Sequence, residues 1–215
     1  MSSLVRPHSP DDQPQFRRRG ILFVVSAPSG AGKSTLLHAL RPTADFVYSV
    51  SCTTRAPRTG EIEGEDYFFL TREEFERRVA AGDFLEYAEV HGNLYGTLCV
   101  RVLDQLEAGI DVLIDIDTQG AANIRANGGP LIHDSLVDVF IMPPNIEELR
   151  RRLLKRGTET PEQIEIRLRN AACEMEAWRD YRYTIITGSV EEDLTKFRAI
   201  MRGERYLSRR LTPAT

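Results

Sequence analysis

Short runs of consecutive apolar residues alternate with longer amphipathic stretches along most of this chain. Each run has the length of a strand buried on both faces of a parallel sheet. The runs cover residues 21–26, 112–116, 136–142 and 183–186. The amphipathic stretches predict helices over 33–40, 100–108, 119–125, 146–155, 161–178 and 191–202. Strands that alternate with helices predict an α/β fold, in which a parallel sheet is covered by helices.

Two segments depart from this alternation. Residues 51–97 begin with a turn region rich in Pro, Gly and Arg and continue into a charged helix over 72–81 and a strand over 84–90, so they predict a small β-rich insertion. Residues 1–19 carry three prolines and end in the triplet 17–19 of arginines, which predicts a flexible arm. For that triplet, a solvent-exposed charge run is favoured over a nucleic-acid contact.

Composition narrows the possible partners. The chain has 215 residues, 41% of them apolar, which is enough for the core of one or two compact units. Its 28 basic and 32 acidic residues give a formal charge of −4, so no general positive field would hold a long nucleic acid. No apolar run reaches the roughly 18 residues that span a bilayer. We therefore expect a protein that binds neither nucleic acid nor membrane.

The number and spacing of the cysteines indicate whether the protein resides in a reducing or an oxidising compartment. Cys52, Cys99 and Cys173 are odd in number and widely spaced, with no partner at metal-ligand spacing. We expect reduced thiols that serve packing, as in a cytoplasmic protein.

The segment after the first predicted strand carries the clearest chemistry. Ala27-x-x-x-x-Gly32-Lys33-Ser34 lies between a strand and a helix, which is the context of a P-loop. In such a loop backbone N–H groups surround phosphates, the lysine reaches the outer phosphates and the serine hydroxyl holds Mg²⁺. Because Ala27 replaces a glycine of the motif, this position needs an ordinary negative φ, and Gly30 and Gly32 must supply the permissive conformations. The predicted nucleotide-binding residues are Ala27, Pro28, Ser29, Gly30, Ala31, Gly32, Lys33, Ser34 and Thr35.

A second motif, an apolar strand that ends in acidic residues, follows at Asp115-Ile116-Asp117. It is typical of a Walker B strand, whose carboxylate orients the metal and its waters. The alternative is a buried strand followed by an aspartate that caps the helix beginning near Gln119.

Arginines gather in two further places. Arg152 and Arg156 are four residues apart on one predicted helix face, and with Arg167 they would neutralise a phosphate chain from the side opposite the P-loop. Arg55 and Arg58 lie on a proline-containing turn, where two guanidinium groups suit a second phosphate. A second phosphate site implies a phosphorylated acceptor.

Together these motifs resemble those of the guanylate kinases, in order over about residues 20–207. The matching segments are Ala27-Pro28-Ser29-Gly30-Ala31-Gly32-Lys33-Ser34, Ser51-x-Thr53-Thr54-Arg55-x-Pro57-Arg58-x-Gly60-Glu61-x-x-Gly64-x-x-Tyr67-x-Phe69, Phe84-Leu85-Glu86, Gly92-Asn93-x-Tyr95-Gly96-Thr97, Asp115-Ile116-Asp117-x-Gln119-Gly120 and Arg156-Gly157-Thr158-Glu159-Thr160.

The resemblance implies transfer of the γ-phosphoryl group of ATP, with Mg²⁺, to GMP or dGMP. It implies a core domain over 20–50, 98–151 and 170–215, a GMP-binding domain over 51–97 and a helical LID over 152–169. The implied catalytic residues are Lys33, Arg152, Arg156 and Arg167, with Ser34 at the metal. The implied GMP-binding residues are Ser51, Arg55, Arg58, Tyr67, Glu86, Tyr95, Thr97, Asp115 and Asp117. The chain departs from the family pattern at Thr118, where bacterial relatives often have Trp, and at 187–189, where Thr-Gly-Ser replaces an Asn-Asp-Asp type sequence.

Two other functions would fit parts of this pattern. Guanylate kinase domains of scaffold proteins bind partners without catalysis, but they typically lose P-loop and LID residues that this chain retains, such as Lys33 and Arg152. A related P-loop kinase would act on a phosphorylated sugar. Glu86 and Ser51 argue against it, because a carboxylate accepts from the N1–H and N2–H₂ donors of guanine. The alternative for Glu86 is a strand residue that faces solvent.

Overall fold

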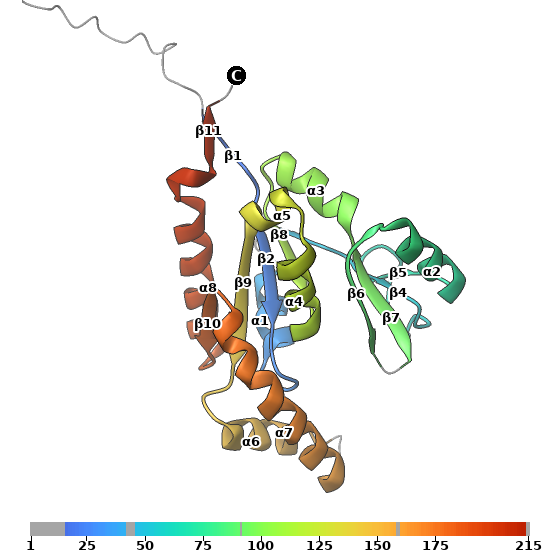
Figure 1. Ribbon diagram of the computed structural model, residues 1–215. Helices are drawn as coiled ribbons and strands as arrows, with labels where there is room; N and C mark the ends of the chain where they lie inside the picture. The colour runs from blue at the N-terminus through green and yellow to red at the C-terminus, as the bar shows by residue number, and fades with distance from the viewer. Residues whose placement is uncertain (1–15, 42–45, 91, 158–159, 214–215) are drawn as a thin grey trace, which may run out of the picture.

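A parallel five-stranded sheet forms the centre of the molecule, with the strand order β10-β9-β2-β8-β3 (Figure 1). The computed structural model describes residues 16–41, 46–90, 92–157 and 160–213, without the side chain of Arg156. The strands of this central sheet are β2 (Leu22–Ser26), β3 (Val47–Tyr48), β8 (Val112–Asp115), β9 (Leu136–Met142) and β10 (Tyr183–Ile186).

Helices cover both faces of the central sheet, so the predicted α/β fold is confirmed. Alternate residues of β2 point to opposite faces: Phe23 packs with α1 and α8, whereas Leu22 packs with α3, α4 and α5, and both side chains are fully buried. The covering helices are α1 (Lys33–Leu40), α3 (Cys99–Glu107), α4 (Thr118–Asn127), α5 (Pro130–Ser135) and α8 (Val190–Arg205).

A second, four-stranded sheet stands beside the central one, with the order β5-β4-β7-β6 (Figure 1). Its own apolar cluster is centred on Phe75, which is fully buried and stacks on Phe84 at a centroid distance of 4.3 Å. Thr71 caps the single helix of this unit by accepting from the backbone N–H of Glu74. The elements are β4 (Cys52–Thr53), β5 (Phe68–Phe69), α2 (Arg72–Ala81), β6 (Phe84–Val90) and β7 (Asn93–Leu98).

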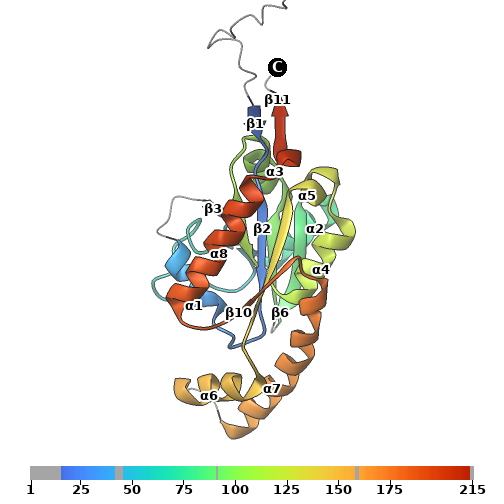
Figure 2. The same ribbon diagram turned by 90° about the vertical axis from the view of Figure 1, so that its left-hand side faces the viewer.

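Two helices, α6 (Ile146–Arg156) and α7 (Pro161–Met175), project beyond the carboxyl ends of the central strands (Figure 2). They bury a separate cluster that includes Leu149 and Leu168. The helix predicted over 161–178 ends at Met175 and continues as a 3₁₀ turn, η2 (Glu176–Asp180). Within the described ranges, no helix is long and apolar enough to cross a membrane.

Both ends of the described chain meet at the opposite end of the molecule (Figure 2), where β1 (Phe16–Arg18) pairs antiparallel with β11 (Leu211–Pro213). The structure therefore differs from the predicted arm over 1–19 at its last residues, and the rest of that arm lies outside the described residues. The physical reason is Arg18, whose guanidinium donates to Asp111 at 2.5 Å and to the carbonyl of Gly109 at 3.2 Å. A short 3₁₀ turn, η3 (Ser208–Arg210), precedes β11.

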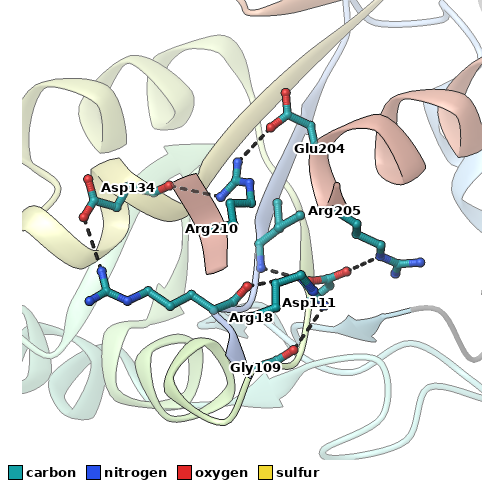
Figure 3. Close-up of polar contacts among 9 residues, drawn as sticks. Arg18, Gly109, Asp111, Asp134, Glu204, Arg205 and Arg210 are labelled. Atoms are coloured by element: carbon teal, nitrogen blue, oxygen red, sulfur yellow. Dashed lines mark hydrogen bonds and ion pairs between the residues drawn. The ribbon is translucent and has the colours of Figure 1, made fainter. Parts of the chain in front are cut away.

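Asp111 and Glu204 are the buried carboxylates of this end (Figure 3). Besides Arg18, Asp111 accepts from the backbone N–H of Ile21 at 2.9 Å and from Nε of Arg205 at 2.7 Å. Glu204 accepts from Arg210 at 2.8 Å. Ion pairs thus join β1 and η3 to the end of α8, and a backbone hydrogen bond ties Ile21, directly before β2, to Asp111.

Candidate active site

The loop between β2 and α1 is built to receive an anion. Gly30 and Gly32 have φ angles of 89° and 104°, so the two glycines supply the permissive conformations that the sequence analysis assigned to them. Gly32 is the N-cap of α1 and provides no side-chain cap, which leaves the first N–H groups of the helix for a ligand. The predicted nucleotide-binding residues lie in this loop, at 27–32, and in the first turn of α1, at 33–35.

Lys33 joins the P-loop to the end of β8. Its ammonium group forms an ion pair with Asp115 and donates to the carbonyl of Ile116 at 3.2 Å. Both side chains of the pair are only partly exposed, with exposed fractions of 20% for Lys33 and 26% for Asp115. The lysine thus lies at the adjacent carboxyl ends of β2 and β8.

Asp117 has two roles in the structure. Its side chain accepts from the backbone N–H of Gly120 at 2.7 Å, which makes it the N-cap of α4. The capping interpretation is therefore confirmed for Asp117. The same exposed residue also lines a pocket that reaches Asp115.

That pocket, which we call the acceptor pocket, has a volume of about 310 Å³ and lies between the central sheet and the four-stranded sheet. Seven of the predicted site residues line it, from the P-loop, β8 and the insertion. Its lining residues are Lys33, Ser51, Tyr67, Glu86, Ala88, Val90, Tyr95, Gly96, Asp115, Ile116 and Asp117. A further pocket, also of about 310 Å³, shares Ser51, Tyr67 and Asp115 with it and includes Ser34.

Glu86 is the buried carboxyl group of the acceptor pocket. Only 7% of the residue is exposed, so the alternative of a solvent-facing strand residue is wrong. Oε1 of Glu86 accepts from the hydroxyl of Thr97 at 2.8 Å, on the neighbouring strand β7. Burial raises the pKa of Glu86 to about 7. A ligand that donates hydrogen bonds would stabilise the ionised form of this buried carboxyl group.

Arg55 and Arg58 lie beside the acceptor pocket but do not line it. Arg55 donates to Glu61 at 2.8 Å, and its guanidinium lies 5.4 Å from the ring centroid of Tyr67. Arg58 has an exposed side chain, and its backbone N–H donates to Glu61 at 2.7 Å. Hydrogen bonds from Arg55 and Arg58 lower the pKa of Glu61. Glu61 was not predicted as the partner of Arg55, although Gly60-Glu61 belongs to the same motif.

A larger pocket, of about 560 Å³, extends from the P-loop to the start of α8, and we call it the donor pocket. Arg152 enters it from α6, donating to the P-loop carbonyl of Ala31 and to Glu148, each at 2.8 Å. Arg151 and Arg152 hold the pKa of Glu148 at about 2. The lining residues are Gly30, Ala31, Gly32, Thr35, Leu36, Glu148, Arg151, Arg152, Lys155, Gly188, Ser189, Val190 and Asp193.

The structure brings one of the three predicted LID arginines to the P-loop. Arg167 is half-buried on α7 and is not among the residues that line the donor pocket. The side chain of Arg156 lies outside the described residues. Glu148, which orients Arg152, was missed, because a glutamate in the first turn of a helix is common for reasons of helix stability alone.

Gly188 and Ser189 line the donor pocket, in the segment 187–189 where the chain departs from the family pattern. Ser189 caps α8 in a capping box with Glu192, and Asp193 accepts from the backbone N–H of Gly188 at 2.9 Å. These polar side chains are therefore engaged in holding the start of the helix. The spacing Ser-x-x-Glu is the sequence signal for this cap.

Known proteins resemble this chain along most of its length. The family model of guanylate kinases matches residues 19–204. A guanylate kinase of Chelativorans sp. (strain BNC1) is 48% identical over 191 residues, 88% of this chain and 86% of the relative. One of Clostridium tetani is 41% identical, over 87% of this chain and 88% of the relative. The crystal structure of guanylate kinase from Anaplasma phagocytophilum superposes with a TM-score of 0.72 at 36% identity, covering 92% of this chain and 93% of that one. This chain belongs to the guanylate kinase family.

Proposed function

We propose that this protein transfers the γ-phosphoryl group of ATP to GMP, giving ADP and GDP. The observation that carries the proposal is the acceptor pocket, which contains the buried carboxyl group of Glu86 and the P-loop lysine Lys33 in one cavity of about 310 Å³. A nucleoside monophosphate needs this combination, because its base must be recognised while its phosphate faces the donor.

The chemistry of Glu86 selects guanine among the common bases. Guanine presents N1–H and N2–H₂ as adjacent donors, and an ionised carboxylate only accepts. Adenine offers an acceptor at N1 and would give the buried carboxylate no donor beyond Thr97, which costs about 1–3 kcal/mol or more for a charged group. Thr97 fixes one oxygen of the carboxylate by its hydrogen bond of 2.8 Å, so the group is oriented before the base binds.

On the donor side, charge neutralisation supplies the catalysis. The loop N–H groups and Lys33 would hold the β- and γ-phosphates, and Arg152 faces the same loop from α6. The acceptor phosphate is already an anion, so the reaction needs no strong general base. Positioning and preorganised charges account for the rate.

The residues present also fit a magnesium ion. The Ser34 hydroxyl and the Asp115 carboxylate line one pocket of about 310 Å³, and both are oxygen ligands of the kind Mg²⁺ prefers. No group of three or more His, Cys, Asp and Glu residues in the described ranges would hold a metal unaided. Mg²⁺ keeps several waters and binds partly through substrate phosphates, so Ser34 and Asp115 would suffice as its protein ligands. When bound, the ion would neutralise charge on the β- and γ-phosphate oxygens.

A coupled assay of ADP release tests the proposal, with GMP, AMP, CMP, UMP and a ribose bisphosphate as acceptors and with and without Mg²⁺. We expect turnover with GMP that exceeds turnover with AMP by several orders of magnitude, and none without the metal. Turnover with the bisphosphate but not with GMP would instead support the sugar kinase. Binding without turnover of any acceptor would support a binding module. The cytoplasmic location stays a prediction.

A further inference from the structure

Gly120, in the first turn of α4, lies directly against the carboxyl groups of the acceptor pocket. A Cβ atom placed on this residue would lie 3.0 Å from Oε2 of Glu86 and 3.3 Å from Oδ1 of Asp117. Both distances are shorter than an ordinary van der Waals contact between carbon and oxygen. The carboxyl groups of Glu86 and Asp117 thus lie so close to Gly120 that a side chain on residue 120 would press against both.

The backbone gives no other reason for a glycine at this position. Gly120 is helical and buried, and it is not among the glycines with a positive φ, so alanine would fit the local conformation. Glycine in a helix is less stable than alanine, because it loses more conformational freedom on folding. Its N–H group donates to Asp117, which any residue but proline would do equally well. The missing side chain, rather than the backbone, is what distinguishes this position.

We infer that Gly120 determines the specificity for the acceptor base, by leaving room for the carboxylate of Glu86 to stand where it meets the donor edge of guanine. This inference rests on the proposed function and deepens it. The residue acts through Glu86, so it is a positioning residue rather than a catalytic one.

Glu86 has little freedom to avoid an added methyl group. Its Oε1 is held by Thr97 at 2.8 Å, and the residue is 7% exposed, so the carboxylate must shift as a unit or lose that hydrogen bond. A displacement of a few tenths of an ångström misaligns the carboxylate with two donors at once. Since misplacement by about 1 Å costs about a hundredfold, we expect a loss of about tenfold. Adenine makes no use of the carboxylate, so turnover of AMP should not fall in proportion.

The test is Gly120→Ala, with Gly203→Ala as its matched control. Gly203 is helical, lies in α8, and has no atom within 4 Å of an added Cβ. For Gly120→Ala we expect the KM for GMP to rise about tenfold, the KM for ATP to stay within twofold, the preference for GMP over AMP to shrink, and Tm to stay within a few degrees. For Gly203→Ala we expect unchanged kinetics and an equal or higher Tm.

A double-mutant cycle separates positioning from a general structural effect. If Gly120 acts through Glu86, adding Gly120→Ala to Glu86→Gln should change the KM for GMP much less than adding it to the wild type. Additive losses would overturn the inference, and so would an unchanged KM for GMP or a parallel rise in the KM for ATP with a lowered Tm. A wild-type protein that does not prefer GMP would refute the proposed function itself, which distinguishes the two failures.

Discussion

Lys33 connects the P-loop to the end of β8, because it pairs with Asp115 and donates to Ile116. We expect Lys33→Ala to fold and to lose about a hundredfold or more in kcat, since removing one preorganised electrostatic donor costs on the order of 3 kcal/mol in the transition state. Steady-state kinetics measure the loss, and circular dichroism and Tm check the fold. A near-normal kcat in the folded variant would contradict this role.

The raised pKa of Glu86 predicts how GMP binding depends on pH. Burial places this pKa at about 7 in the free protein, above the ordinary value of 4.5, and guanine requires the ionised form. Below pH 7 a proton must therefore leave before GMP binds, so kcat/KM for GMP should rise up to about pH 8 and fall about tenfold for each unit below 7. The GMP phosphate, with a second pKa near 6, adds its own step.

Glu86→Gln is the control for this pH dependence. The amide does not titrate, so the step near pH 7 should vanish while the step near pH 6 remains. We also expect kcat/KM for GMP to fall about tenfold or more with little change in the KM for ATP, because the amide accepts less strongly and brings donors of its own. An unaltered profile would show that Glu86 is not the group that titrates.

At the scale of elements, apolar runs and amphipathic stretches were predicted well, down to the four residues of β10, but β3 and β1 were missed. The strand over 136–142 has the predicted bounds because it is a mostly apolar run that is buried on both faces, and the helix over 72–81 because Thr71 and Gly82 cap its two ends. β3, with two residues, contains no period to detect. β1 pairs with a strand more than 190 residues away, a contact that local pattern does not encode.

The site residues, too, were predicted only in part from the sequence. The P-loop was predicted from its motif, because its chemistry depends on residues that are neighbours in the chain. Glu86 was predicted from the resemblance to the guanylate kinases. The partners that hold side chains in place, Glu61 for Arg55 and Glu148 for Arg152, were not predicted. Glu148 lies four residues before Arg152 on one helix, a spacing that indicates an ion pair, so its signal was present in the sequence. The pairing of Arg55 with Glu61 depends on the fold of a loop, which the sequence pattern does not contain.

The four-stranded sheet has its own apolar cluster, and Phe75 fills its centre. Phe75→Ala should cost about 3–5 kcal/mol in this unit. We expect GMP binding to weaken strongly while ATP binding, which uses the P-loop, changes little. Isothermal titration calorimetry with each nucleotide measures this. Equal loss of both affinities would mean that the insertion and the central sheet unfold together.

At the scale of the whole molecule, Asp111 joins β1 to the end of α8 through Arg18 and Arg205. Asp111 is 97% buried, and its removal takes the acceptor away from two guanidinium groups and one backbone N–H. We therefore expect Asp111→Ala to lower the free energy of unfolding by about 3 kcal/mol. Urea denaturation measures the change. Asp134→Ala is the control, because its pair with Arg19 is exposed and should contribute less than about 1 kcal/mol.

The acceptor pocket and the donor pocket both include P-loop residues but are lined by different units. The acceptor pocket lies against β6 and β7, and the donor pocket lies against α6, and each of these units packs around its own apolar cluster. In-line transfer needs the γ-phosphate and the acceptor phosphate in contact and water excluded. We therefore expect both units to move toward the P-loop when both ligands are bound, as rigid bodies about their connecting segments.

Small-angle scattering with GMP and a non-hydrolysable ATP analogue tests this closure. The radius of gyration should fall with both ligands together and change less with either alone, because each ligand draws in only the unit that contacts it. Arg152 gives an internal control. Its hydrogen bond to Ala31 already ties α6 to the P-loop, so Arg152→Ala should weaken the response to the ATP analogue and leave the response to GMP intact. An unchanged radius under conditions where calorimetry shows both ligands bound would contradict closure.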